Sequence, residues 1–382
     1  MQVLQSVLRH AGDLGEALPR WLDMKPDVLL AFGSVSWLRQ LEAALHNHLP
    51  DTHRLGCTSA GEISSQGVSD DTCVVTALRL DAAQVQAAST GLADMADSMA
   101  AGQRLAQQLH APGLRLVWVF GQGVNINGSA MIAGMSQVLG SEVLITGGLA
   151  GDAAAFLETF VFDDTGVHPD RVACVGFYGD SLQVTHGSFG GWEPFGPARR
   201  VTRCHANVLF EVDGESALNV YKRYLGDHAK DLPASGLLFP LAMLGRDHAE
   251  LGLIRTILAV DEEQGSLILA GEIDPEGYLR LMHASTDALV RGAQTAAQSA
   301  CPALQPAGPG LALLVSCVGR KLVMGGRVEE EVEAVADVLR QQVVLAGFYS
   351  YGEISPFTGE LACKLHNQTM TITYLSEAAA SS

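Results

Sequence analysis

The segment L-G-C-T-S-A-G-E-I (Leu55–Ile63) decides the fold, because nearly the same pattern returns near the other end of the chain as L-A-G-F-Y-S-Y-G-E-I (Leu345–Ile354). Both segments place a glycine, a serine and a glycine–glutamate–isoleucine triplet at the same spacing. We interpret L-I-T-G-G-L-A-G-D (Leu144–Asp152) as a third copy, with Gly147, Gly151 and Asp152 in the same frame. Self-similarity of this kind indicates internal duplication.

The same elements surround each copy. A short apolar run and an amphipathic stretch come before it, and another apolar run follows. Aliphatic runs that alternate with helices are typical of α/β layers with partly parallel strands. We therefore predict an α/β protein of two domains, in which duplicated strand–helix–strand units form layered mixed sheets. The expected strands cover residues 28–34, 72–80, 115–123, 171–178, 311–320 and 369–375, and the expected helices include residues 38–45, 131–138 and 328–341.

The last of these helices has a clear apolar face, made by Val328, Val332, Val335 and Leu339. The acidic run Glu329–Glu331 is expected on the opposite, solvated side, close to the helix N-terminus where negative charge is favourable. A metal-binding role is not expected for it.

Residues 183–309 interrupt the repeat. We expect strands at residues 201–212 and 266–273, helices at residues 217–225 and 284–300, and a surface connector at residues 301–310. A chain of 382 residues is too long for one ordinary core, which also favours two domains. The tail, residues 376–382, is expected to fray.

Charge excludes some partners. The formal net charge is −18, from 42 acidic and 24 basic residues. Such a surface repels a phosphate backbone and disfavours docking on an anionic membrane, so we expect neither nucleic acid nor membrane as a partner. No apolar run is long enough for a signal peptide or a membrane helix, and a cytoplasmic protein is expected.

The seven cysteines point to a reducing compartment, because no two of them have C-x-x-C spacing. The chain also lacks G-x-x-x-x-G-K-[ST], H-E-x-x-H and G-x-S-x-G motifs. We therefore do not expect an enzyme. The remaining catalytic alternative is a cysteine-dependent enzyme with Cys57 or Cys317, each at a strand end, as nucleophile.

The three copied segments, Leu55–Ile63, Leu144–Asp152 and Leu345–Ile354, each end in a turn that follows a strand, and we call these segments the first, second and third tips. The tips are the candidate ligand site. Glycine is required where the backbone approaches a ligand or adopts a positive φ, and α/β sheets bind ligands outside the carboxyl ends of their strands. The alternative is structural: the glycines make tight turns and the carboxylates cap neighbouring helices. The candidate ligand-binding residues from the tips are Ser59, Gly61, Glu62, Asp152, Ser350 and Glu353.

Three histidines near apolar residues, His186, His283 and His366, are candidate metal ligands. Haem would need one such imidazole over an apolar slot, with arginines such as Arg199 for its propionates. The alternative is that each histidine is a hydrogen-bonded core residue.

Together, G-C-T-S-A-G-E-I, G-G-L-A-G-D, H-G-S-F-G-G-W-E-P-F-G-P, S-C-V-G-R and G-F-Y-S-Y-G-E-I-x-P resemble the hallmark segments of FIST proteins. The resemblance runs from residue 28 to residue 375. It implies a FIST N-terminal domain at residues 1–216 and a FIST C-terminal domain at residues 217–375. It also brings Gly148, Trp192 and Arg320 into the candidate ligand-binding set.

The resemblance implies a sensory module that binds a small molecule and signals through a separate protein, such as a histidine kinase. One subgroup similar in length and layout contains nitric-oxide-sensing haemoproteins. That similarity implies haem b, bound non-covalently because C-x-x-C-H is absent, with a histidine as axial ligand. His186 and His283 are preferred for this position over His366. The alternative ligand is an amino acid, bound by the serines and glutamates of the tips.

Overall fold

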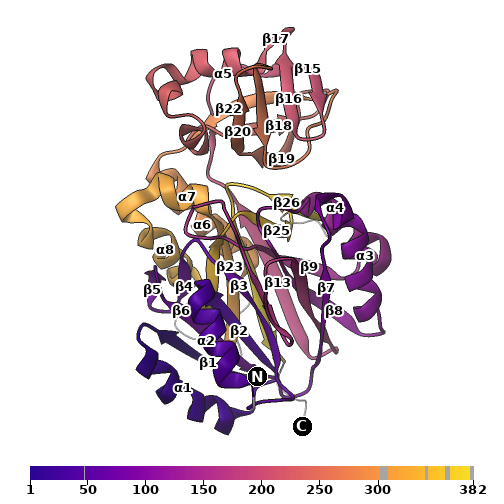
Figure 1. Ribbon diagram of the computed structural model, residues 1–382, viewed down its shortest axis with the longest axis vertical. Coiled ribbons are helices and arrows are strands. Elements are labelled where there is room, and N and C mark those ends of the chain that lie inside the picture. The colour runs from indigo at the N-terminus through magenta and orange to yellow at the C-terminus, as the bar shows by residue number, and fades with distance from the viewer. Residues whose placement is uncertain (47, 302–308, 340–342, 358–361, 379–382) are drawn as a thin grey trace.

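The computed structural model describes residues 1–46, 48–301, 309–339, 343–357 and 362–378. It has a large body and a smaller one above it, joined at a narrow waist (Figure 1). Both the α/β class and the mixed sheets expected from the sequence are confirmed. No helix within the described residues is long and apolar enough to cross a lipid bilayer.

The large body contains three copies of one unit. In each copy, two parallel strands are joined by a helical connection, and a later strand pairs antiparallel with the first of them. The first unit has β2 (Val28–Gly33), α2 (Val35–Leu45), β3 (His53–Thr58) and β6 (Cys73–Arg79). The second has β8 (Leu114–Gly121), α4 (Gly128–Leu139), β9 (Leu144–Leu149) and β12 (Arg171–Tyr178). The third has β23 (Gly310–Cys317), α7 (Val318–Met324), α8 (Glu329–Leu339), β24 (Val343–Ser350) and β27 (Met370–Glu377).

Each unit also begins with a strand and a helix, and most of these elements were not predicted from the sequence. The opening strand lies at the edge of its sheet, antiparallel to the last strand of the unit. The pairs are β1 (Gln2–Leu8) with α1 (Ala11–Met24), β7 (Gln84–Gly91) with α3 (Ser98–Leu109), and β13 (Leu182–Phe189) with α6 (Thr286–Ala300). Of these, only α6 was expected, as a helix at residues 284–300.

The units exchange hairpins in a closed cycle. After its second parallel strand, the chain leaves its own sheet and adds two short strands to a neighbouring one. Thus β4 (Glu62–Ser64) and β5 (Gly67–Ser69) extend the third unit, β25 (Gly352–Pro356) and β26 (Cys363–His366) extend the second, and β10 (Val161–Asp163) and β11 (Gly166–His168) extend the first. Each sheet has six strands, and no unit can complete its sheet alone.

The three sheets enclose a common core. One face of each sheet points inward, while helices cover the other face. At the centre, the ring centroids of Phe32, Phe120 and Phe348 lie 4.7–5.5 Å apart. Gly148 contributes to this packing by having no side chain, since a Cβ there would lie 2.7 Å from Val315 Cγ1.

The smaller body is an insertion in the third unit, between β13 and α6. It is a nine-stranded antiparallel sheet whose apolar face packs against α5. Its elements are β14 (Glu193–Pro194), β15 (Arg199–His205), β16 (Val208–Val212), β17 (Glu215–Ser216), α5 (Ala217–Leu225), β18 (Leu241–Leu244), β19 (Glu250–Arg255), β20 (Ile257–Asp261), β21 (Ser266–Leu269) and β22 (Tyr278–His283). We call it the inserted domain and the rest the main body. Short 3₁₀ helices lie at Met95–Asp97, Gly226–Asp231, Ala234–Leu237 and Gly325–Arg327.

Several expected boundaries differ from the observed ones. The single strand expected at residues 201–212 is a hairpin, β15 and β16, and the strand expected at residues 266–273 ends at Leu269. β27 continues to Glu377, two residues into the tail that was expected to fray, and pairs there with β13. Residues 302–308 of the expected connector, 340–341 of the expected helix and 379–382 of the tail lie outside the described residues.

The family boundary predicted between residues 216 and 217 falls between β17 and α5, within the inserted domain. The main body therefore takes strands from both sides of that boundary. The division of the chain at this point stays a prediction that the family resemblance implies.

Candidate functional site

The three tips meet at one end of the main body. From the first tip, Thr58 and Ser59 accept hydrogen bonds from the amides of Gly151 and Ala153 in the second, with N···O distances of 2.9 and 3.1 Å. Ala60 N donates to Tyr349 O of the third tip at 2.9 Å. A further bond of 3.1 Å, from Tyr351 N to Leu149 O, joins the third tip to the second. The tips that the sequence singled out are therefore in mutual contact.

The first and third tips contain the same buried hydrogen-bond network. Ser59 donates to Glu62 Oε1, while the amide and hydroxyl of Thr72 donate to Oε2 at 3.2 and 2.8 Å. In the third tip, Ser350 donates to Glu353 at 2.7 Å, and Thr369 N and Oγ1 donate at 3.2 and 2.9 Å. In both, the carboxylate ties its tip to the start of the next strand of the same unit, which supports a structural role for the serine–glutamate pair.

Glu353 should make stability depend on pH. Burial raises the pKa of Glu353 to about 7, against the three hydrogen bonds that lower it. The folded protein thus binds this proton more tightly than the unfolded chain, and the stabilisation is complete below about pH 4.5 and lost as the pH rises through about 7. We expect Glu353→Gln to remove about 3 kcal/mol of pH-dependent change in unfolding free energy. Urea unfolding from pH 5 to 8 measures this change. If the unfolding free energy varied with pH equally in the wild type and the variant, the prediction would be contradicted. Glu333→Gln, which replaces an exposed carboxylate, is the control.

The middle tip differs from the expected frame. Gly147 occupies the position of Gly56 and Gly347, but the middle segment is one residue shorter from that glycine to its acidic residue. Asp152 is therefore not the counterpart of Glu62. Its carboxylate instead accepts the amides of Phe156, Leu157 and Glu158 at 2.8–3.0 Å, and the hydroxyl of Tyr351 also donates to it.

The loop held by Asp152 is strained. Ala153, Ala154 and Phe156 have φ angles of 55°, 67° and 56°, a left-handed region that side chains with a Cβ disfavour. Strain of this kind persists only where surrounding contacts enforce it, and it concentrates at functional sites.

A pocket of about 490 Å³ opens between the first and second tips, and we call it the tip pocket. Four of the predicted residues, Ser59, Gly61, Glu62 and Asp152, line it. The start of α2, the strained loop and α7 complete its wall. The other lining residues are Ser34, Val35, Thr58, Ala60, Asp70, Asp71, Ala153, Ala154, Glu158, Phe160, Val318, Lys321 and Leu322.

The tip pocket is acidic. Asp70, Asp71, Asp152 and Glu158 line it together with the buried Glu62, whose pKa is raised, mainly by burial. Lys321 is the single cation among its described lining residues, and it is engaged with Asp70 and with Ala60 O. Lys321 was not among the predicted residues although it directly follows the S-C-V-G-R segment, because lysine on a short helix carries no local signal.

The other predicted ligand residues lie elsewhere. Ser350 and Glu353 are fully buried and do not line the tip pocket, and Gly148 is in the central core. Trp192 donates from Nε1 to Gln368 O at 2.8 Å. Arg320 is fully buried in an ion pair with Glu331, at 2.7 Å.

The acidic run of α8 was expected to be solvated, and for Glu331 that was wrong. Its side chain is fully buried, and Arg320, Ser316 and Tyr349 donate hydrogen bonds to it from within the third unit.

The structure places the three candidate haem ligands apart from the tip pocket. His366 is 1% exposed, its Nε2 lies 2.8 Å from Ser355 O, and burial lowers its pKa to about 4. His283 packs edge-on against Phe195, and His186 lies in β13. Among the described residues, no histidine lines the tip pocket, and no group of three or more His, Cys, Asp or Glu could hold a metal ion.

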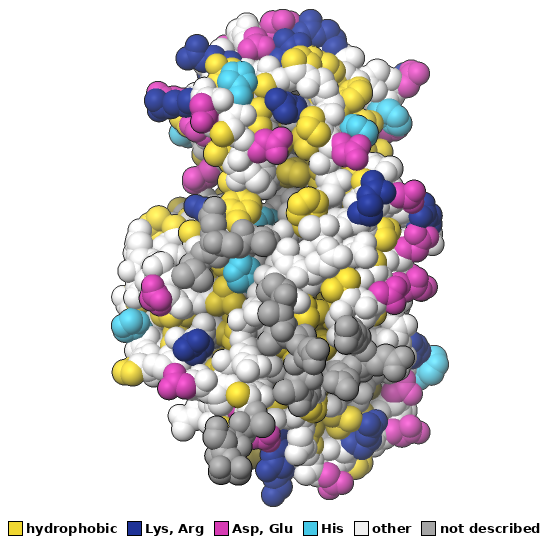
Figure 2. Space-filling model, turned by 180° about the vertical axis from the view of Figure 1, so that it is seen from behind, with side chains coloured by type: hydrophobic (Ala, Val, Ile, Leu, Met, Phe, Trp, Pro, Cys, Tyr) yellow, Lys and Arg dark blue, Asp and Glu magenta, His cyan; other side chains and the backbone are white. Residues whose placement is uncertain are grey.

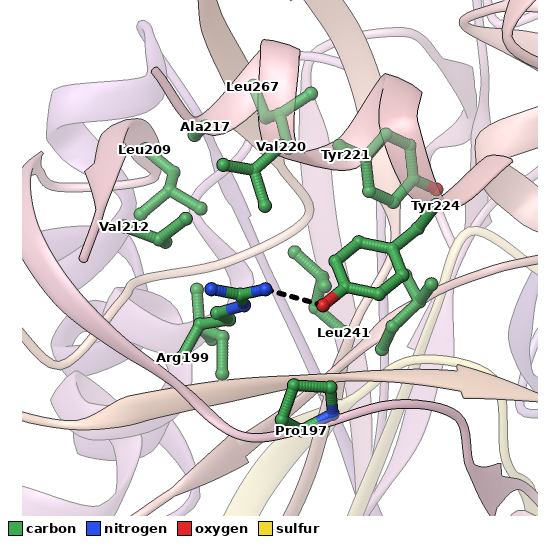
Figure 3. Close-up of a pocket in the computed structure, with 12 residues that line it drawn as sticks. Pro197, Arg199, Leu209, Val212, Ala217, Val220, Tyr221, Tyr224, Leu241 and Leu267 are labelled. Carbon is green, nitrogen blue, oxygen red and sulfur yellow. Dashed lines mark hydrogen bonds between the residues drawn. The ribbon is translucent and has the colours of Figure 1, made fainter. Parts of the chain in front are cut away.

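An apolar pocket inside the inserted domain is also too small for haem, at about 40 Å³ (Figure 3). Arg199, considered for the propionates, points across this pocket and donates to the hydroxyl of Tyr224 at 2.6 Å. It also pairs with Asp213 at 3.1 Å, so its charge is already compensated.

The two candidate nucleophiles are inaccessible. Cys57 and Cys317 are 0% and 4% exposed, and burial raises the pKa of both thiols. Because the thiolate is the reactive form, neither is set up for attack.

Comparison with known proteins gives a family match over most of the chain. The model of the FIST N domain matches residues 27–215, and that of the FIST C domain matches residues 217–356. No curated protein matches. One solved structure, the crystal structure of cyanuric acid hydrolase from A. caulinodans, aligns over 99% of this chain and 99% of its own, with 8% identity and a TM-score of 0.40, too low to inform on function.

Proposed function

The chain belongs to the FIST family of sensory domains, and from that premise we propose that it is a non-enzymatic sensor of a small ammonium-bearing ligand, an amino acid or amine. The observation that supports this most directly is the tip pocket, where residues of all three units surround an excess of carboxylates. We further propose that it acts in the cytoplasm and signals through a separate protein, such as a histidine kinase.

The charges of the tip pocket favour the ammonium group. Asp71, Asp152 and Glu158 add negative charge that the single Lys321, already engaged with Asp70, does not balance. A protonated amine would neutralise part of this excess. A ligand that also carries a carboxylate can place it at the start of α2, where Ser34 and Val35 line the pocket and the helix dipole favours negative charge.

The strained loop offers a route from ligand to partner. Its wall residues Ala153 and Ala154 face the tip pocket, and the next residues, Phe156 and Leu157, are 39% and 79% exposed. Leu322, on the opposite wall, is 47% exposed. A ligand that shifts the loop would therefore move apolar side chains on the surface, where a partner protein can read the change.

Ligand binding to the tip pocket should raise the unfolding temperature. A ligand at about 100 times its dissociation constant stabilises the native state by about 2.7 kcal/mol. We expect one or more amino acids or amines to give such a shift in a thermal screen, and Asp71→Asn with Glu158→Gln to weaken binding about tenfold. Glu333→Gln, an exposed carboxylate on α8, is the matched control. No shift across the screen, or a shift that the paired variant keeps in full, would count against the proposal.

We do not extend the proposal to haem or nitric oxide, because none of His186, His283 and His366 lines the tip pocket or the apolar pocket of the inserted domain. Reconstitution with haem b checks this point. A stoichiometric Soret band that changes on addition of nitric oxide would reverse it.

A further inference from the structure

A second cavity lies between the inserted domain and the main body, and we call it the interdomain cleft. Its volume is about 580 Å³. β18, β19 and residues 272–274 form one wall, while α4, the start of β9 and β26 form the other. Viewed from behind, hydrophobic side chains are visible near the waist between the two bodies (Figure 2). Ile132, Ile145, Met243, Leu253 and Leu365 make the lining largely apolar.

One buried cation faces this apolar space. Arg255, the last residue of β19, lines the cleft and is 4% exposed. Its Nε donates to Glu272 O at 3.2 Å, and its Nη1 donates to Ile254 O and to Leu365 O of the main body at 3.3 and 3.2 Å. Within the described part of the chain, these carbonyls are its only hydrogen-bond partners, and no carboxylate is within ion-pair distance of it. The second terminal nitrogen, Nη2, makes none of these bonds.

The backbone is shaped around this guanidinium. Gly271 has a φ of +134°, and a Cβ at that position would lie 2.8 Å from Arg255 Nε and 2.9 Å from Cζ. Burial without a carboxylate is costly, and it lowers the pKa of Arg255 to about 10. The group is still charged at neutral pH, so an anion in the cleft would be attracted to it.

The charged residues that line the cleft indicate which class of anion it can bind. Glu272 and Asp274 line the cleft on the side of the inserted domain, and Lys364 lines it on the side of the main body. Two carboxylates near one guanidinium disfavour a dianion such as phosphate. A single carboxylate attached to an apolar chain or ring matches both the one guanidinium and the apolar walls.

We propose that the interdomain cleft is a second ligand site, which takes a monocarboxylate with an apolar body and pairs its carboxylate with Arg255. Such a ligand contacts both bodies at once and fixes the inserted domain against the main body. The site is separate from the tip pocket and does not depend on what binds there.

Titration calorimetry with octanoate, and with octan-1-ol as the neutral chain of the same length, tests this on the full chain. Octanoate is expected to bind, and octan-1-ol to bind at least about tenfold more weakly. Arg255→Gln should weaken octanoate binding about tenfold or more without changing octan-1-ol. Glu272→Gln should strengthen octanoate binding a few-fold, since it removes a repelling charge.

A variant that leaves Arg255 untouched covers the case in which Arg255→Gln does not fold. Ala133→Phe fills the cleft from α4 and should abolish octanoate binding, whereas Gln137→Phe, on the exposed side of the same helix, should not. The proposal is overturned if octanoate does not bind, if it binds no better than octan-1-ol, or if binding survives Ala133→Phe. Binding of octanoate that Asp71→Asn with Glu158→Gln alters would place it in the tip pocket, which also overturns the proposal.

Discussion

Replacing Gly347 with alanine should cost about 4 kcal/mol or more in unfolding free energy, enough to leave little folded protein. A Cβ at this position would overlap the backbone carbonyl of Leu314 on the neighbouring parallel strand. That oxygen belongs to a main chain paired along the whole of β23, so it cannot move aside without breaking the sheet. The change is measured by urea unfolding of purified protein, or by the soluble fraction if none can be purified.

The repeat supplies two further tests of the same argument. Gly56 and Gly147 occupy the equivalent position, and a Cβ there would overlap the carbonyls of Ala31 and Val119 in the same way. We expect alanine at either to be as damaging as at Gly347. Gly15→Ala is the control, because it lies on the exposed side of α1 with no atom near its added Cβ, and alanine should stabilise this helix by about 0.5–1 kcal/mol. A loss at Gly347 below about 1 kcal/mol would contradict the close approach of the two strands.

These glycines explain why the repeat could be found in the sequence. The close approach demands glycine at one position of each unit, and the buried strands around it demand aliphatic runs, so three segments carry the same marks. The helices were also predictable from their apolar faces: Leu38, Leu41 and Leu45 are buried as α2 requires. The convergence of the three tips follows from the same repeat.

The pairing of strands that lie far apart in the chain could not be predicted from the sequence. Leu55–Ile63 reads as one continuous strand end, but β3 and β4 belong to different sheets, and nothing local shows that Glu62 pairs with Phe348. The inserted domain was visible only as a break in the pattern, since antiparallel strands of mixed polarity carry weak signals. Within the site, a serine three residues before a glutamate is equally consistent with ligand binding and with a buried structural hydrogen bond. Only the hydrogen bonds from Thr72 and Thr369 to these glutamates show that the role is structural.

The ion pair of Arg320 and Glu331 gives the second large expected effect. Both side chains are fully buried, and Arg320 donates to Glu331 from Nε at 3.1 Å and from Nη2 at 2.7 Å. It also donates to Leu289 O at 2.9 Å and to Gly190 O. Gly190 lies where the chain leaves β13 for the inserted domain, and Leu289 lies on α6, just after the chain returns. Arg320 therefore joins the two chain crossings at the base of the inserted domain.

Arg320→Met should reduce the unfolding free energy by about 3–5 kcal/mol, because it leaves the charge of Glu331 buried without its partner. Adding Glu331→Gln removes that charge while keeping an acceptor for Ser316 and Tyr349, so the double variant should recover part of the loss. Hydrogen exchange at residues 190–192 and 286–290 should also rise in Arg320→Met. A double variant less stable than Arg320→Met would mean that the two charges do not act as a pair.

The neighbouring residue separates structure from ligand binding. Lys321 follows Arg320 on α7 but points into the tip pocket, and its ion pair with Asp70 is partly exposed. Lys321→Met should therefore change stability by no more than about 1 kcal/mol. It should also strengthen the binding of an ammonium ligand, because the pocket loses its one cation. Two results would contradict the assignment of Arg320 to a structural ion pair and of Lys321 to the wall of the tip pocket. One is that Lys321→Met is as destabilising as Arg320→Met, and the other is that it weakens the binding of an ammonium ligand.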